Sequence, residues 1–107
     1  MDKLTIDELE ILTPDELGWI LITEVVKAPP NYQYIQDILD VGGPIDFRTK
    51  SGWTALHHAA WWGKIGAVKF LISKGAEVNA RTNDGRTAWD IATDKTRILS
   101  HPELEPK

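Results

Sequence analysis

Apolar and polar residues follow one another along this chain in a pattern that predicts helices. Between residues 65 and 73, apolar residues recur three or four positions apart and so fall on one face of a helix. They are Ile65, Val68, Leu71 and Ile72. Gly75 follows the segment, where a helix commonly ends on a residue in the left-handed conformation. The pattern therefore predicts a helix over 65–73.

Capping residues mark two further helices in the first half of the chain. Thr13, Pro14 and Glu16 together form a helix-start signal: a cap, a proline in the first turn and a glutamate that can close a capping box. We expect this helix to run from Pro14 to about Lys27, because two prolines follow it. The segment 32–41 predicts the next helix, which two glycines end.

Two shorter helical segments complete the pattern. Thr54 is a suitable N-cap, and residues 55–60 favour a short helix that Gly63 ends. Residues 1–12 either form an additional short helix or stay frayed, and the spacing of their apolar residues slightly favours the helix.

The chain also matches itself at a spacing of 33 residues. Residues 39–59 align without gaps to residues 72–92, and seven of the 21 pairs are identical, where unrelated segments of ordinary composition would share about one or two. A fixed period of this length predicts stacked units, which offer a binding surface more readily than a reaction pocket. The identical pairs are Gly42/Gly75, Arg48/Arg81, Thr49/Thr82, Gly52/Gly85, Thr54/Thr87, Ala55/Ala88 and Ala59/Ala92.

The most complete unit, residues 48–80, carries a recognisable motif. It contains GWTALHHAA, then Gly63 after two intervening residues, then VKFLI and finally GAEVNA. This unit resembles an ankyrin repeat, whose pattern is G-x-T-P-L-H-x-A-A-x-x-G, a V-x-x-L-L helix and G-A-D-V-N-A. Ala55, and Ala88 one period later, stand where the family usually has proline. Alanine favours helix strongly, so this departure costs rigidity at the helix start and leaves the fold unchanged.

The resemblance implies an all-α ankyrin-repeat solenoid of about three helix-turn-helix units joined by β-turn or hairpin loops. We expect a single domain over residues 1–107. Within it, 1–47 is a divergent N-terminal repeat with a leading segment, 48–80 is the complete repeat, and 81–107 is a truncated C-terminal capping repeat. The last repeat is expected to be truncated because 94–100 is too short for a full second helix.

Composition describes an ordinary globular chain, with 42% apolar and 26% charged residues. The absence of cysteine excludes disulfides and thiolate chemistry. The acidic N-terminus lacks the layout of a secretory signal, and the apolar runs are too short to span a bilayer. We therefore expect a cytoplasmic protein without membrane association.

Charge is distributed unevenly around the net value of −4. Residues 1–46 carry ten acids and two bases, a net −8, while residues 47–107 carry six acids and ten bases, a net +4. This polarity either steers an oppositely charged partner to one end or only keeps the ends of a stack soluble. The overall acidity argues against a general nucleic-acid binder.

No arrangement of side chains points to catalysis, to a metal or to a cofactor. His57 and His58 are adjacent, so on a helix their side chains diverge by about 100° and cannot share a metal ion. In ankyrin repeats the residue that matches His57 bonds to the capping threonine and the neighbouring loop, and the resemblance implies that structural role here. No serine or threonine has a base at motif spacing, and no glycine-rich loop follows a strand. We expect a protein that is not an enzyme.

The five tryptophans divide into two groups. Trp19 lies within an apolar helix and Trp89 takes the place of a core leucine one period later, so both are expected in the core. Trp53, Trp61 and Trp62 stand at positions that vary in ankyrin repeats and line the concave, partner-facing side. Large aromatic residues that the repeat does not require are typical of interface anchors. The alternative is that one of them fills a gap beside the irregular first repeat.

Cations fall at or near the same face by period, and they are Lys50, Lys64, Lys74 and Arg86. Tryptophans ringed by cations suit an acidic or aromatic-containing peptide, through ion pairs and cation–π contacts. The sequence thus predicts a non-catalytic module that binds a protein partner on its concave face, as a monomer or weak dimer. The three tryptophans are the expected anchors, and Lys50, Lys64 and Lys74 are expected to set the charge complementarity. Two alternatives stay open. The aromatic patch binds a small ligand or single-stranded nucleic acid, the latter disfavoured by charge, or it mediates homodimerisation.

Asn79 is a candidate site of modification. It follows Glu77 and Val78, with Leu71 eight residues upstream. This arrangement resembles the hairpin asparagines that asparaginyl hydroxylases modify in ankyrin repeats. A simpler role, compatible with modification, is that Asn79 stabilises its own loop.

Overall fold

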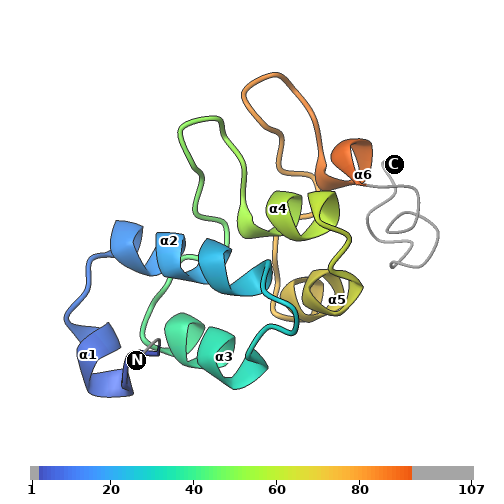
Figure 1. The fold of residues 1–107 in the computed structure, drawn as a ribbon. Helices are drawn as coiled ribbons and strands as arrows, with labels where there is room; N and C mark the ends of the chain where they lie inside the picture. The colour runs from blue at the N-terminus through green and yellow to red at the C-terminus, as the bar shows by residue number, and fades with distance from the viewer. Residues whose placement is uncertain (1–2, 93–107) are drawn as a thin grey trace.

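The computed structural model describes residues 3–92, which form six helices and no strand. The helices are α1 (Ile6–Glu10), α2 (Pro14–Val25), α3 (Tyr32–Asp40), α4 (Ala55–Trp61), α5 (Ile65–Ser73) and α6 (Ala88–Ile91) (Figure 1). The expected truncation over 94–100 lies outside the described residues.

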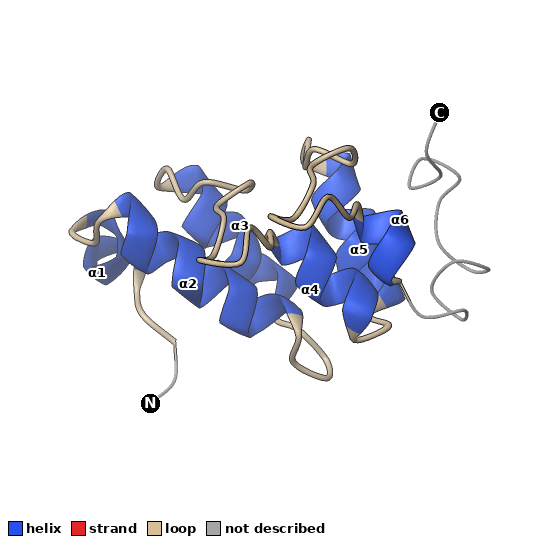
Figure 2. Ribbon diagram, turned by 90° about the horizontal axis from the view of Figure 1, so that it is seen from above, coloured by secondary structure: helices blue, strands red, loops and turns tan. Residues whose placement is uncertain are grey.

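The helices lie in two layers, with the long loops projecting on one side (Figure 1). One layer contains α2, α4 and α6, and the other contains α3 and α5, with α1 packed against α3 at the N-terminal end. Within this arrangement α4 packs against α5 of its own unit and against α2 and α6 of the neighbouring units. Seen from above, the units follow one another in a row (Figure 2). This is the predicted all-α stack of helix pairs.

Four of the helices begin at a threonine that closes a capping box. The threonine side chain accepts the backbone N–H three residues further on, and that residue's side chain accepts the backbone N–H of the threonine. The boxes satisfy N–H groups that would otherwise lack a partner at the helix start. They also fix the starts of α4 and α6, where alanine replaces the family's proline. The pairs are Thr5/Glu8, Thr13/Glu16, Thr54/His57 and Thr87/Asp90.

Helix boundaries lie close to the predicted ones. The helix α5 spans the predicted 65–73, and α1 shows that the leading segment is helical rather than frayed. The sequence predicts that α2 runs to about Lys27, but the helix ends at Val25. The backbone N–H of Lys27 donates to the carbonyl of Glu24 at 3.1 Å, so the chain tightens into a turn before the prolines.

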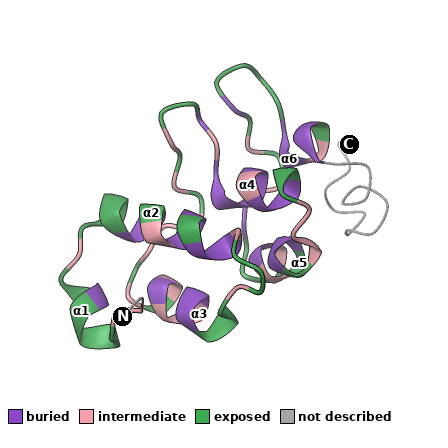
Figure 3. Cartoon of the chain, viewed as in Figure 1, coloured by how far each residue is buried: buried purple, intermediate pink, exposed green. Residues whose placement is uncertain are grey.

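The helices of both layers carry buried residues (Figure 3), and these residues pack into one hydrophobic core. Ala59 and Ala60 of α4 are fully buried, and their small side chains let the neighbouring helices approach closely. Burying one large aliphatic side chain stabilises the fold by about 1.5–3 kcal/mol. The largest fully buried apolar residues are Leu9, Leu21, Ile35, Ile38, Leu56 and Leu71.

The two long loops, 41–54 and 74–87, are joined by hydrogen bonds at the spacing of the repeat. Asn83 donates from Nδ2 to the carbonyl of Lys50 at 2.7 Å, and the guanidinium of Arg48 donates to the carbonyl of Arg81. Each of these bonds joins residues 33 apart. The backbone N–H of Asn83 also donates to the carbonyl of Ser51, at 3.0 Å. The second loop therefore holds the backbone of the first.

Gly52 and Gly85 occupy equivalent places in these loops, with φ of 83° and 86°. A Cβ on Gly52 would lie 2.5 Å from Oδ1 and 2.7 Å from the backbone nitrogen of Asn83, whereas one on Gly85 would meet nothing within 4 Å.

We expect Gly85→Ala to cost about 1–2 kcal/mol of unfolding free energy for the left-handed backbone alone. Gly52→Ala should cost at least about 1 kcal/mol more, because the loops must separate. Urea unfolding measures both, and equal losses would contradict the close approach.

Candidate functional site

A groove of about 550 Å³ opens where α2, the first long loop and α4 meet. One lining residue comes from α2, four come from the loop, and three come from α4 and its C-terminal cap. They are Trp19, Thr49, Lys50, Ser51, Trp53, His58, Trp61 and Trp62. The groove therefore spans two successive units of the stack.

The structure brings together the three tryptophans that the sequence predicts as partner-binding. Trp61 and Trp62 are 50% and 60% exposed, and Trp53 is half-buried. The ring of Trp53 lies edge-on to Trp61, with centroids 6.3 Å apart, and its centroid is 5.0 Å from that of the His58 imidazole. Trp53 is thus held by α4, while the other two tryptophans remain largely open to solvent.

Trp19 also lines the groove, and the prediction that it lies in the core is wrong. Its side chain is 51% exposed, and its ring meets Phe47 edge-on with centroids 5.6 Å apart. The buried stripe of α2 includes Leu17 and Leu21. Trp19 lies two residues from each, about 200° around the helix from both, and so faces away from the core. The continuous apolar run over 19–22 suggested that Trp19 is buried, whereas the helical period places it on the exposed face of α2.

Of the three predicted lysines, Lys50 lines the groove, and Lys64 and Lys74 do not. Lys64 is the N-cap residue of α5 and is partly buried there. Lys74 is the C-cap of the same helix, with its ammonium 5.4 Å from the centre of the Phe70 ring. Because α5 belongs to the other layer, the residues at its ends do not join the groove lining, although the repeat spacing suggested a common face.

His57 has the structural role that the family resemblance implies. The backbone N–H of Thr54 donates to its Nδ1 at 3.1 Å, and Nε2 lies 3.1 Å from the carbonyl oxygen of Arg86. Since Nδ1 accepts, the proton is assigned to Nε2, which donates to that carbonyl. Burial lowers the pKa of His57, so its ring is neutral at pH 7. The side chain thereby ties the start of α4 to the next loop.

His58 forms part of the groove wall beside Trp53. Burial, and to a smaller extent the neighbouring His57, lowers the pKa of His58, which keeps the ring uncharged at pH 7. Its Nε2 is buried and makes no hydrogen bond within the part of the chain that the structure describes. His58 therefore contributes a flat, neutral surface to the groove.

Two other residues that the sequence singles out lie away from the groove lining. Trp89, predicted in the core, is only half-buried, although it packs against the core cluster. Asn79 is exposed in the loop after α5, and its backbone N–H donates to the carboxylate of Glu77 at 3.1 Å. This bond agrees with a role in the local turn, and hydroxylation of Asn79 stays a prediction.

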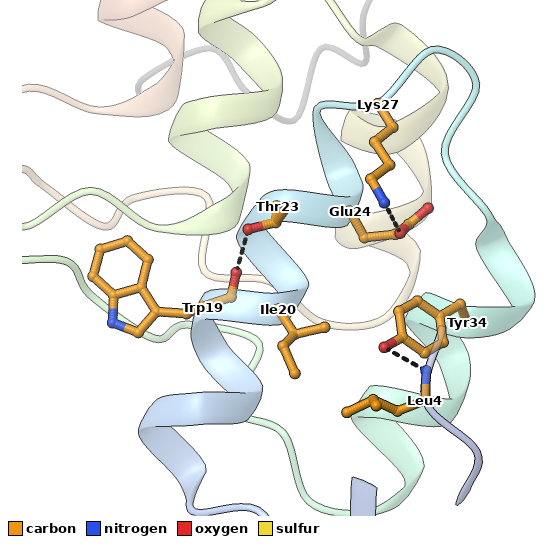
Figure 4. Close-up of a pocket in the computed structure, with 7 residues that line it drawn as sticks. All are labelled: Leu4, Trp19, Ile20, Thr23, Glu24, Lys27 and Tyr34. Atoms are coloured by element: carbon orange, nitrogen blue, oxygen red, sulfur yellow. Dashed lines mark hydrogen bonds and ion pairs between the residues drawn. The ribbon is translucent and has the colours of Figure 1, made fainter. Parts of the chain in front are cut away.

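A second hollow, of about 340 Å³, shares Trp19 with the groove and contains a buried carboxylate (Figure 4). Oε1 of Glu24 lies 2.7 Å from Nζ of Lys3 and 3.2 Å from Nζ of Lys27, and Oε2 accepts the backbone N–H of Asn31 at 2.7 Å. Burial acts to raise the pKa of Glu24, but these hydrogen bonds outweigh it and hold the pKa below its usual value. Both oxygens are occupied, so this carboxylate is a structural clamp and not a free base.

Two features of other protein classes are absent from residues 3–92. No three histidine or acidic side chains there come close enough together to hold a metal ion. No helix in the same part of the chain is long and apolar enough to cross a membrane.

Comparison with known proteins identifies the family. A family model of ankyrin repeats in three copies matches residues 23–101, and the chain belongs to the ankyrin-repeat family. Ankyrin repeats are generally non-catalytic modules that bind other proteins.

Several curated relatives match the chain over most of its length. It is 29% identical over 96 residues to the E3 ubiquitin-protein ligase hecd-1 of Caenorhabditis elegans, covering 90% of this chain and 4% of that protein. It is 32% identical over 93 residues to protein phosphatase 1 regulatory subunit 12A of Mus musculus, covering 77% and 9%. It is 36% identical over 76 residues to ankyrin repeat domain-containing protein OPG015 of monkeypox virus, covering 69% and 15%. The chain thus spans less than a sixth of the length of each.

The buried His57 predicts that stability falls as the pH drops below about 6.5, the usual pKa of histidine. Above that pH the ring is neutral in both the folded and the unfolded chain. Below it the unfolded chain binds a proton more readily, because folding lowers the pKa of His57, so the unfolding free energy decreases until the pH reaches the lowered value. Urea titrations across this range should give a shallower pH dependence for His57→Asn. An equal slope in both proteins would contradict this account.

The clamp at Glu24 predicts a second loss of stability. Glu24→Gln keeps the shape but removes the charge that two lysines and a backbone N–H share, and we expect a loss of about 2–3 kcal/mol in unfolding free energy. Lys27→Gln is the matched control, and it should cost under about 1 kcal/mol because Lys27 is well exposed. Chemical denaturation measures both, and a Glu24→Gln protein as stable as the wild type would show that the clamp contributes nothing.

Proposed function

We propose that the chain binds a protein or peptide partner in the groove between α2, the first long loop and α4. Trp53, Trp61 and Trp62 are the anchors in this proposal, and Lys50 supplies charge complementarity. Lys64 and Lys74 have no part in it, because they do not line the groove. Membership of the ankyrin-repeat family supports binding of a protein. The position of the tryptophans supports the groove as the place where that protein binds.

The observation that carries the proposal is the exposure of Trp61 and Trp62 side by side in one groove. A tryptophan has about 200 Å² of surface to bury, so a half-exposed one leaves about 100 Å² in contact with water. Covering that area would contribute about 2–3 kcal/mol for each residue. The fold does not gain this energy, since the core is complete without these two rings. A partner that covers them gains it.

The shape of the groove is also preorganised before a partner binds. Trp53 is held between His58 and Trp61, and the loop that carries it is bonded to the following loop through Asn83. A surface fixed in this way loses little conformational entropy on binding, which favours affinity. Exposed tryptophans on a mobile loop would not have this advantage.

Trp61→Ala and Trp62→Ala should weaken binding without unfolding the protein. Peptides selected from a random display library against the immobilised wild-type chain provide the ligand, and calorimetric titration provides the dissociation constant. Each substitution should raise that constant by about 30-fold or more, as expected for an anchor worth about 2 kcal/mol. The melting temperature should stay near the wild-type value because both side chains are largely exposed.

Ile11→Ala is the matched control. Ile11 is 82% exposed and lies outside the groove lining, so its truncation should change neither binding nor melting. If the tryptophan variants unfold, these residues belong to the core. If they stay folded and bind the selected peptides as tightly as the wild type, the groove is not the binding site.

A further inference from the structure

We infer that the groove takes a peptide in which a bulky apolar side chain stands next to an acidic residue. The apolar side chain is seated among the tryptophans, and the carboxylate pairs with the ammonium of Lys50 at the rim. This inference rests on the proposed function and specifies the chemistry of the partner.

The charges of the groove lining favour an anion. Among residues 3–92, eight line the groove. Lys50 is the one charged residue of these, and none of the eight carries a carboxylate. His58 is neutral at pH 7, because burial lowers its pKa. A cationic ligand would therefore meet the like charge of Lys50 with no counter-ion beside it. An anionic group beside an apolar one finds both a cation and an apolar surface.

Lys50 is held in place by its backbone and left free at its ammonium. Its carbonyl accepts the side chain of Asn83 at 2.7 Å, so the second loop fixes its position. The side chain is exposed, and it forms no ion pair or hydrogen bond within residues 3–92. A fixed but unpaired cation beside an apolar surface is suited to an incoming carboxylate.

The acid that shares a hollow with this cation already has partners of its own. Lys50 shares a neighbouring hollow with Asp84 and Arg86. Asp84 accepts a hydrogen bond from the hydroxyl of Thr82 and pairs with Arg86 at 3.2 Å, and both contacts lower its pKa. Arg86 is thereby neutralised by Asp84, which leaves Lys50 as the cation that a ligand in the groove can use.

A peptide fits this charge pattern better than single-stranded nucleic acid does. A nucleic-acid strand carries a charge at every nucleotide and is bound by a row of cations along its backbone, with bases stacked on aromatic rings. Within the part of the chain that the structure describes, this groove offers aromatic rings but a single lysine. A peptide with one carboxylate beside one or two apolar side chains matches this combination of one cation and several aromatic rings.

The test uses the random-peptide display library named above, selected on the wild-type chain at low salt. Enriched peptides that lose binding to Trp61→Ala should carry an aspartate or glutamate within about three residues of a large apolar side chain. Their dissociation constants should rise by about 3- to 10-fold with Lys50→Gln and by more with Lys50→Glu. Lys74→Gln is the matched control and should leave them unchanged, since Lys74 lies outside the groove.

A charge swap distinguishes an ion pair from a general effect of net charge. A peptide whose acid is replaced by lysine should bind the wild-type chain weakly and should bind Lys50→Glu more tightly. Lys50 is exposed, so both variants should melt at the wild-type temperature. Raised salt should weaken wild-type binding and should have a smaller effect on Lys50→Gln.

The outcomes separate this inference from the proposed function. If the selected peptides depend on Trp61 but carry no acid and ignore Lys50, the groove binds peptides and the inference on their chemistry is wrong. If oligothymidylate or oligouridylate binds the groove more tightly than any selected peptide, the partner is a nucleic acid and both proposals fail. Both also fail if no peptide depends on the groove tryptophans.

Discussion

The hydrogen bonds between successive loops set the geometry on which everything else in this structure depends. The ring of His57 spans from the cap of α4 to the carbonyl of Arg86, and Asn83 holds the carbonyl of Lys50. These bonds orient the first long loop, and with it Trp53 and the rim of the groove. The helix pairs provide the buried apolar area, but helix packing alone would leave that loop free to tilt. The polar contacts decide where the candidate site lies.

Much of the fold could be predicted from the sequence, because its determinants are local. Thr13 and Thr54 mark helix starts by a mechanism that acts within one turn, and the 33-residue self-match gives the order of units. The tryptophans of the middle repeat were also found from the sequence, because they break a pattern that the repeat otherwise keeps. Repeat spacing gives each residue a position within its unit, and a tryptophan that the position does not require is visible without a structure.

The rest of the site depends on how elements meet in space. Trp19 joins the groove because α2 lies beside α4, which no local signal in the sequence states. Lys64 and Lys74 were misplaced because the repeat spacing does not say which layer an element joins. The role of Glu24 was missed for a similar reason, since Lys3 lies 21 residues away in the sequence and Asn31 reaches the carboxylate only after the turn that follows α2. Local rules place residues on helices, and only packing shows which helices share a surface.

The groove takes Trp19 from one unit and its remaining lining from residues 49–62 of the next unit, so it is complete only when the two units are docked. If the units come apart, the groove loses the wall that Trp19 provides. By mass action, a ligand that fits it favours the docked pair and opposes the separation of the units. Binding in the groove and docking of the two units are therefore thermodynamically linked. A partner bound in the groove would act as an additional element of the fold.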